Sequence, residues 1–145
     1  MTENSDMKRV AHYINKIQQL DKIKRMDGSS YLKDFIDGQD LINDLLLEAN
    51  KSESIAKSNL DQAESIAYLD RANDYLQAKG IKDTADARKR YVNIDEDVKK
   101  AVDEKAKAEA MVTFLKGKLS VLKQAHDDLK KILYTDQNLT PFGGV

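Results

Sequence analysis

The chain contains no cysteine and no tryptophan, and only one proline and six glycines are spread over its 145 residues. The absence of cysteine excludes disulfides and thiolate metal sites, and it is compatible with a reducing cytoplasm. No apolar run approaches the roughly 20 residues that a membrane span requires. The first six residues show neither the basic flank nor the apolar core of a secretory signal. We therefore expect a cytoplasmic protein that makes no membrane contact.

Charged side chains are abundant instead, at 34% of the residues, yet the net charge is only −1. A charge-rich composition with few helix-breaking residues is typical of long solvated helices. Near-neutral charge favours neither nucleic acid nor membrane as a partner for the chain as a whole. Six tyrosines and three phenylalanines make a modest core for this length. We therefore expect self-association to supply part of the stability.

The longest regular pattern is a heptad spacing of core positions near the C-terminus. Such a repeat predicts a helix that packs in a coiled coil against a partner helix. The positions are Val98, Ala101, Lys105, Ala108, Val112, Leu115, Leu119, Leu122, His126, Leu129 and Leu133. We expect the Lys105 ammonium to reach out of the seam towards solvent.

Further apolar residues lie beside this seam and widen the apolar stripe. They are Met111, Phe114, Val121, Ala125 and Ile132. One partner helix would cover only part of the stripe, which favours a bundle or a ring of subunits. The residues to which we assign oligomerisation are Val112, Leu115, Leu119, Leu122, His126, Leu129 and Leu133.

The remainder of the chain also has helical periodicity, and no strand pattern is present. Residues 1–36 are predicted to form an N-terminal helix and a connector, and residues 37–133 a helical hairpin with arms over about 39–79 and 83–133. Residues 134–145 lack periodicity and are predicted to be a flexible tail. The fold class is all-α: a long antiparallel helical hairpin or coiled coil with an additional N-terminal helix, in an oligomeric bundle or ring.

Local signals mark the ends of these helices. Gly80 is placed as the C′ residue of the first arm. The stretch from Asp83 to Asp86 indicates a new N-terminus. The Asn93-x-x-Glu96 spacing is that of a capping box, so we expect a break near Asn93.

Candidate catalytic and metal-binding residues are few. His126 would need a partner to bind a metal or relay a proton, and the only other histidine, His12, lies in a different helix. A polar core residue that sets helix register is the better account. Asp95, Glu96 and Asp97 begin a helix, where the helix dipole explains them more simply than a Ca²⁺ or Mg²⁺ site. We predict a non-enzymatic protein without catalytic residues, metal or cofactor.

Basic residues gather at the predicted hairpin tip, where a tyrosine follows them. They are Lys82, Arg88, Lys89 and Arg90, with Tyr91. A cationic surface with tyrosines nearby is what sequence-independent single-strand binding uses, because charge follows the phosphates and rings stack on bases. The alternative is a solvated helix face with charge pairs between successive turns.

Two stretches resemble a known family. The sequence Tyr-Val-Asn-Ile-Asp-Glu-Asp-Val-Lys-Lys at residues 91–100, followed by Phe114-x-x-Gly117-x-Leu119-x-x-x-Lys123 and Lys130-x-Ile132, is similar to the C-terminal half of UvsY-type phage recombination mediators. The upstream Asp-Tyr-Leu-Gln-Ala-Lys-Gly at residues 74–80 resembles the end of that family's first long helix. The similarity covers roughly residues 60–133.

This resemblance implies an all-helical hairpin that assembles into a ring and has no catalytic activity. It implies a homo-oligomer that binds single-stranded DNA and assists recombinase loading onto strands coated by a single-strand-binding protein, in the host cytoplasm if phage-encoded. The family's DNA contacts include basic residues just before the Asp-Tyr pair. Arg71 is the corresponding residue here, displaced by one position.

A second hypothesis stays open from the residues themselves. The chain would then be a coiled-coil structural or adaptor protein, such as a phage-type assembly component, that acts through protein–protein contacts without nucleic acid. Its near-neutral charge favours this alternative, whereas the basic hairpin tip favours DNA binding.

Overall fold

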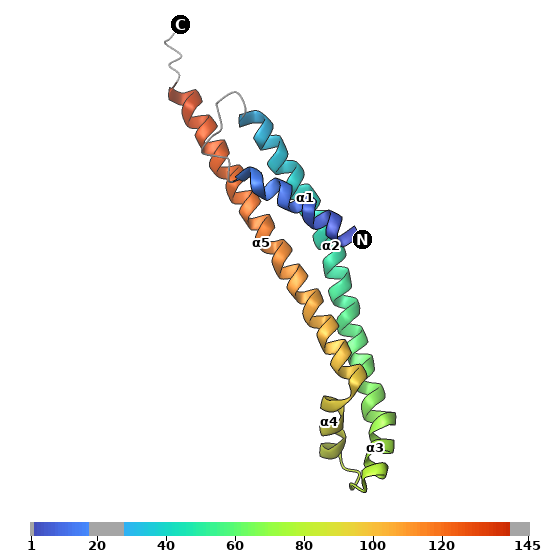
Figure 1. Ribbon diagram of the computed structural model, residues 1–145. Coiled ribbons are helices and arrows are strands. Elements are labelled where there is room, and N and C mark those ends of the chain that lie inside the picture. Colours follow the sequence, from blue (N-terminus) through green and yellow to red (C-terminus); the bar gives the residue numbers. More distant parts are fainter. Residues whose placement is uncertain (1, 18–27, 140–145) are drawn as a thin grey trace. The chain divides into compact units, whose positions relative to one another are not determined.

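The computed structural model describes residues 2–17 and 28–139, and nearly all of them are helical (Figure 1). The elements in order are α1 (Thr2–Ile17), α2 (Gly28–Ile66), the π-helix η3 (Ala67–Arg71), α3 (Ala72–Lys79), α4 (Ala85–Ile94) and α5 (Glu96–Leu139). The predicted all-α fold is therefore confirmed. Among the described residues, no helix is both long enough and apolar enough to cross a membrane.

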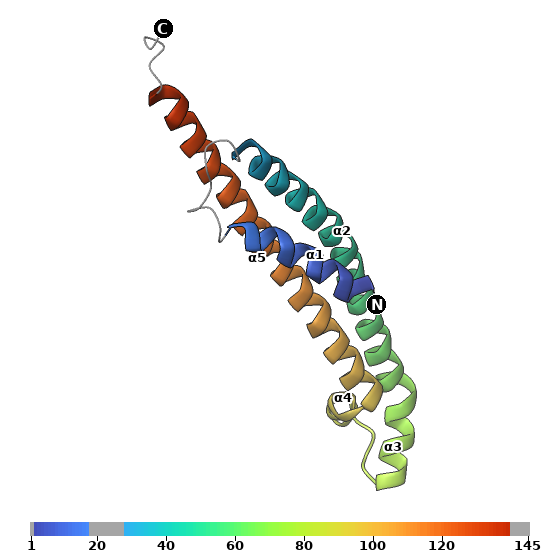
Figure 2. The ribbon, with the colours of Figure 1, turned by 45° about the horizontal axis from the view of Figure 1, so that its top comes forward.

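The chain forms two compact units, which are described separately. Unit 1 comprises Met1–Leu47 and Phe114–Val145, and unit 2 is Glu48–Thr113. In each unit a portion of α2 lies antiparallel to a portion of α5, as Figures 1 and 2 both show. The antiparallel pairing of two long helices is as predicted, and the structure places both helices in one chain, which the sequence pattern left open.

Unit 1 is a three-helix arrangement in which α1 packs on α2 and α5 (Figure 2). The three helices meet at Gly38 of α2, where an added Cβ would lie 2.9 Å from Tyr13 Cγ of α1 and 3.1 Å from Leu122 Cδ1 of α5. A salt bridge between Lys16 and Asp34 joins α1 to α2. The side chains with the least exposure in this unit are Val10, Phe35, Ile42, Leu115, Leu122, Ala125 and Leu129.

The predicted heptad seam is correct as a core stripe of α5, since every one of its positions is buried or half-buried. The ammonium of Lys105 reaches Glu109 one turn on, at 3.7 Å, as expected for a charge leaving the seam. His126 keeps 23% of its side chain exposed, with Nδ1 3.5 Å from Asp127.

The seam belongs to the chain's own core, and its assignment to oligomerisation stays a prediction. In the single chain, Leu115, Leu122 and Leu129 are at most 2% exposed, and Val112 is 5% exposed within unit 2. Leu119, His126 and Leu133 are half-buried. A heptad repeat predicts an apolar seam but does not specify which helix packs against that seam. In this chain α1 and α2 cover the seam, which therefore offers little surface to a neighbouring subunit.

Two predicted segment boundaries are wrong. Residues 1–36 are predicted to be an N-terminal helix and a connector, but residues 28–36 lie inside α2, which begins at Gly28. Gly38 is buried within α2, and α1 lies so close to it that a side chain at this position would clash. The predicted tail begins later than residue 134, because α5 continues to Leu139. Residues 18–27 and 140–145 lie outside the described residues.

Unit 2 has a smaller, alanine-rich core and an irregular helix. Its buried apolar residues include Ala56, Ala67, Ala72, Leu76 and Val98. In η3 the N–H of Ala72 donates to the carbonyl of Ala67, five residues back, which is the hydrogen bond of a π-helix. Helical conformation is otherwise continuous from α2 through η3 into α3.

The end of α3 is formed as predicted. Gly80 has φ = 64°, its N–H donates to the carbonyl of Gln77 (3.2 Å), and the N–H of Ile81 donates to that of Leu76 (2.9 Å). This is a Schellman motif with glycine at C′. Thr84 caps α4, because its hydroxyl accepts from the N–H of Ala87 at 3.1 Å.

The predicted cap at Asn93 is wrong by two residues. α4 continues to Ile94, and Asp95 caps α5 by accepting from the N–H groups of Asp97 (3.0 Å) and Val98 (3.1 Å). The Asp95 carboxylate also has partners outside the helix, as described below.

Two glycines provide a matched prediction. Gly80→Ala places a Cβ at a positive φ and is expected to lower the free energy of unfolding by about 1 kcal/mol. Gly117→Ala in α5 meets nothing within 4 Å and is expected to raise it by about 1 kcal/mol, because alanine is the better helix former. Chemical denaturation of the two variants measures both effects. If both substitutions changed the free energy of unfolding in the same direction, either the positive φ of Gly80 or the open space at Gly117 would be contradicted.

Candidate nucleic-acid interface

The predicted binding residues surround α4 in unit 2, and the first feature of this region is a clamp made by Arg88. Its Nε and Nη2 donate to the two carboxylate oxygens of Asp83, each at 2.7 Å. Its Nη1 donates to the carbonyls of Tyr68 (2.7 Å) and Leu69 (3.3 Å) in η3. Both carbonyls belong to the π-helix, and Arg88 supplies each with a donor. All three nitrogens of the guanidinium thus donate within the chain.

A second clamp, centred on Asp95, holds the other end of α4. Arg71 of η3 binds the Asp95 carboxylate in a bidentate manner, with Nε to Oδ2 at 2.7 Å and Nη2 to Oδ1 at 2.8 Å. The Tyr91 hydroxyl donates to the same Oδ2 at 2.6 Å. Arg71 also contacts the exposed carboxylate of Asp97 at 3.3 Å. Asp95 itself is only 4% exposed.

These contacts determine the protonation states in the Asp95 clamp. The hydrogen bonds from Arg71 hold the pKa of Asp95 well below its usual range, and the bonds from Tyr91 and the N–H of Val98 act in the same direction. The pKa of Tyr91 is raised, chiefly by its hydrogen bond to Asp95. The clamp therefore consists of a carboxylate, a guanidinium and a neutral phenol at neutral pH.

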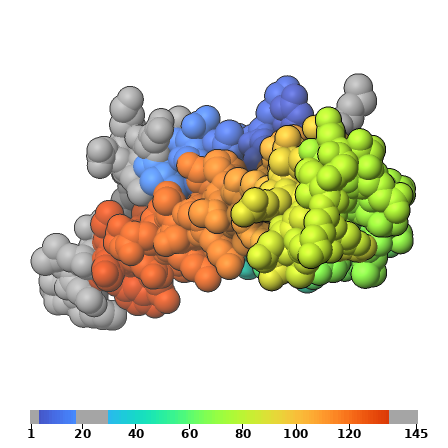
Figure 3. Space-filling view, turned by 90° about the horizontal axis from the view of Figure 1, so that it is seen from below, coloured from blue at the N-terminus to red at the C-terminus, as the bar shows by residue number. Residues whose placement is uncertain are grey.

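The two clamps position α4 beside α3, and a groove of about 520 Å³ lies between these helices. Its charged lining residues are Lys82, Arg90 and Asp86. Its aromatic wall is a pair of rings, Tyr75 and Tyr91, with centroids 4.9 Å apart. Leu76, Ile81 and Ile94 supply an apolar floor and rim. Figure 3 looks onto this end of unit 2, where α3 and α4 form the exposed surface.

Lys82 and Arg90 are exposed, and neither forms an ion pair with any described residue. Residues 74–94 carry five basic and three acidic side chains, and one of these acids, Asp83, is already paired with Arg88. The groove consequently presents two unpaired cations and one carboxylate, Asp86, next to two tyrosine rings that are tilted by 34° to each other.

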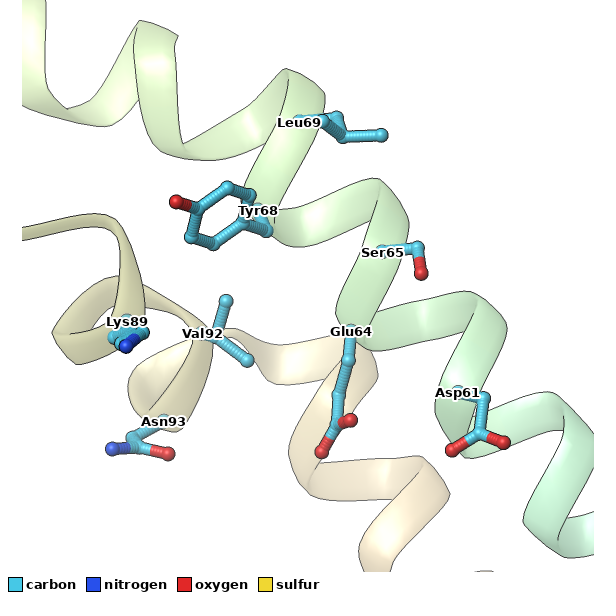
Figure 4. A pocket seen from close by; sticks show the side chains of 8 residues that line it. All are labelled: Asp61, Glu64, Ser65, Tyr68, Leu69, Lys89, Val92 and Asn93. Atoms are coloured by element: carbon cyan, nitrogen blue, oxygen red, sulfur yellow. The ribbon is translucent and has the colours of Figure 1, made fainter. Parts of the chain in front are cut away.

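A second hollow, of about 700 Å³, lies between the α2–η3 segment and α4 (Figure 4). Lys89 and Asn93 line it from α4, while Asp61, Glu64 and Tyr68 line it from the facing helix. Two carboxylates against one ammonium make this hollow unsuitable for a phosphate chain. The described residues contain no cluster of histidine and carboxylate side chains that could hold a metal ion.

The structure therefore separates the six predicted nucleic-acid-binding residues into three groups. Lys82, Arg90 and Tyr91 lie together in the groove, and Lys89 faces the acidic hollow. Arg71 and Arg88 are held by carboxylates inside unit 2. Tyr75, one of the tyrosines that the sequence places near these cations, also lines the groove. Sequence reasoning missed the pairing of Arg71 with Asp95, which no local pattern signals.

Comparisons of this chain with protein families, with curated proteins and with solved structures found no match.

Proposed function

We propose that this protein is a non-enzymatic DNA-binding protein of the recombination-mediator type, and that the α3–α4 groove holds single-stranded DNA. The observation that carries the proposal is the combination of two unpaired cations, Lys82 and Arg90, with the Tyr75–Tyr91 ring pair in one groove. Cations follow the phosphate backbone and aromatic faces accept bases without regard to sequence. The resemblance to phage recombination mediators supports the same function, with recombinase loading as its purpose.

The cations that we assign to DNA binding in the groove are fewer than those predicted from the sequence. All three guanidinium nitrogens of Arg88 donate hydrogen bonds within the chain. The Arg71 guanidinium binds the buried Asp95 carboxylate in a bidentate manner. Releasing either group to a phosphate would leave carboxylates or carbonyls without partners. We therefore assign the phosphate contacts to Lys82 and Arg90.

A fluorescent oligonucleotide titration tests this assignment. We expect Lys82→Ala/Arg90→Ala to weaken binding of single-stranded DNA about tenfold or more at low salt. The slope of log Kobs against log salt concentration should fall by about 1.4, because each phosphate contact to a single strand contributes about 0.7. The matched control is Lys51→Ala/Lys100→Ala, which removes the same charge from exposed, unpaired positions of unit 2 and should leave affinity nearly unchanged.

One observation favours the alternative, an adaptor that binds proteins. Ile81 and Ile94 line the groove and are 48% and 47% exposed, which suits the apolar face of a peptide segment. If the unmodified chain binds no oligonucleotide at low salt, the DNA proposal is overturned. If the control variant loses as much affinity as the groove variant, binding does not involve the groove.

A further inference from the structure

The last part of α5 carries a second heptad seam beside the one that forms the core. Its positions precede the core positions by one residue, and they are Phe114, Lys118, Val121, Ala125, Asp128 and Ile132. The spacing alternates strictly between four and three residues, so the six positions form one line on the helix. All belong to unit 1.

Unlike the core seam, this second seam is largely uncovered in the single chain. Phe114 and Val121 are each 44% exposed and Ile132 is 53% exposed, while Ala125 lies buried at its base. Apolar side chains repeating at heptad spacing on an exposed helix face indicate a helical partner.

The two charges of the second seam also lack opposite charges. The Lys118 ammonium lies 5.4 Å from the centroid of the Phe114 ring, and the Asp128 carboxylate accepts a hydrogen bond from Gln124 at 2.9 Å. Neither forms an ion pair with any residue that the structure describes. Each is thus available to a charge on a partner.

We propose that the second seam pairs with the same seam of a second copy of this chain, in an antiparallel arrangement about a two-fold axis near residue 123. In this register Phe114 faces the partner's Ile132, Val121 faces the partner's Ala125, and Lys118 faces the partner's Asp128. The exposed Phe114 and Ile132 then meet, Val121 lies over the small, buried Ala125, and the two-fold symmetry creates two Lys118–Asp128 pairs. A parallel pairing would place Lys118 against Lys118 and Asp128 against Asp128.

The seam spans about 27 Å of helix, because its first and last positions are 18 residues apart and an α-helix rises 1.5 Å per residue. An interface of this length, made by one helix from each copy, falls at the small end of specific interfaces. The dimer is therefore a reversible one whose population depends on concentration. This inference does not rest on DNA binding, although a dimer would carry two grooves and could gain avidity from them.

Sedimentation equilibrium of the full chain tests the dimer. The mass should rise with concentration from 16.4 kDa towards twice that value. Lys118→Asp and Asp128→Lys should each weaken association about tenfold or more, because each creates two like-charge contacts. Combining them should restore association. Lys116→Asp, an exposed and unpaired position on another face of the same helix, is the matched control and should have little effect.

Cysteine cross-linking tests the orientation, since the natural chain has no cysteine. Phe114→Cys/Ile132→Cys should form disulfide-linked dimers on oxidation, whereas Phe114→Cys alone should form few. Efficient cross-linking of the single variant would indicate a parallel pairing and overturn the proposal. A mass that stays monomeric up to about 1 mM, or failure of the charge-swapped double variant to recover, would overturn it as well. Circular dichroism confirms that each variant remains helical.

Discussion

Asp95→Ala is expected to lower the free energy of unfolding by about 3 kcal/mol, the largest effect that we predict for a polar side chain. Loss of the N-cap of α5 costs about 1 kcal/mol, and loss of the charge-assisted bonds from Arg71 and Tyr91 about 2 kcal/mol more. The alanine also leaves the Arg71 guanidinium and the Tyr91 hydroxyl without their acceptor.

Chemical denaturation monitored by circular dichroism measures this loss. Asp70→Asn serves as the control, because Asp70 is an exposed carboxylate of the same η3 segment with no partner among the described residues, and its substitution should change stability by less than about 0.5 kcal/mol. If Asp95→Ala were as mild as the control, the bidentate contact with Arg71 would not exist in solution.

The Asp95 clamp also predicts how stability depends on pH. The pKa of Asp95 is lower in the folded chain than the value of about 3.9 usual for an unfolded chain. The unfolded state therefore binds more protons in acid, and the stability from this carboxylate is present above about pH 4 and lost as the pH falls below it. Asp95→Asn removes the titrating group, so its stability should decline less steeply between about pH 4 and 2 than that of the unmodified chain.

Gly38→Ala is expected to lower the free energy of unfolding by about 2 kcal/mol, and to do so by loosening α1. The added Cβ would lie 2.9 Å from Tyr13 Cγ and 3.1 Å from Tyr13 Cβ, atoms near the backbone of α1 that cannot swing away. Overpacking of this kind costs about 1–3 kcal/mol, more than alanine gains as a helix former.

Hydrogen exchange locates this effect. Amides of α1 should exchange faster in Gly38→Ala, whereas those of α3 and α4 in unit 2 should be unaffected. Gly117→Ala makes the same chemical change in another helix where the space is open, and it should stabilise the chain. Stabilisation by both substitutions would show that α1 does not pack against Gly38.

The features that sequence patterns predicted correctly are those that depend on local periodicity and on caps. The heptad line of α5 is an example, because its apolar spacing reflects one buried face of a helix. Gly80 at the end of α3 and Thr84 at the start of α4 are others, since each satisfies backbone groups within a few residues of itself.

Local patterns failed where a residue serves a distant contact. The predicted boundary between residues 36 and 37 falls inside α2, where Gly38 leaves the space that α1 needs. Arg71 and Arg88 were interpreted as cations for a ligand. Their guanidinium groups are instead bound to Asp95, 24 residues along the chain, and to Asp83 and the π-helix carbonyls. Charge alone does not distinguish a free cation from a paired one.

The sequence by itself determined that this protein is helical, where its long helices pair and which face of α5 is apolar, because these follow from repeats of three and four residues. Only the tertiary structure decided which cations remain free and which helix fills each seam. Those outcomes depend on contacts between segments far apart in the chain: Arg71 with Asp95, Arg88 with η3, and α1 with Gly38. They leave Lys82 and Arg90 as the free cations of the groove and the second seam of α5 as the uncovered apolar face.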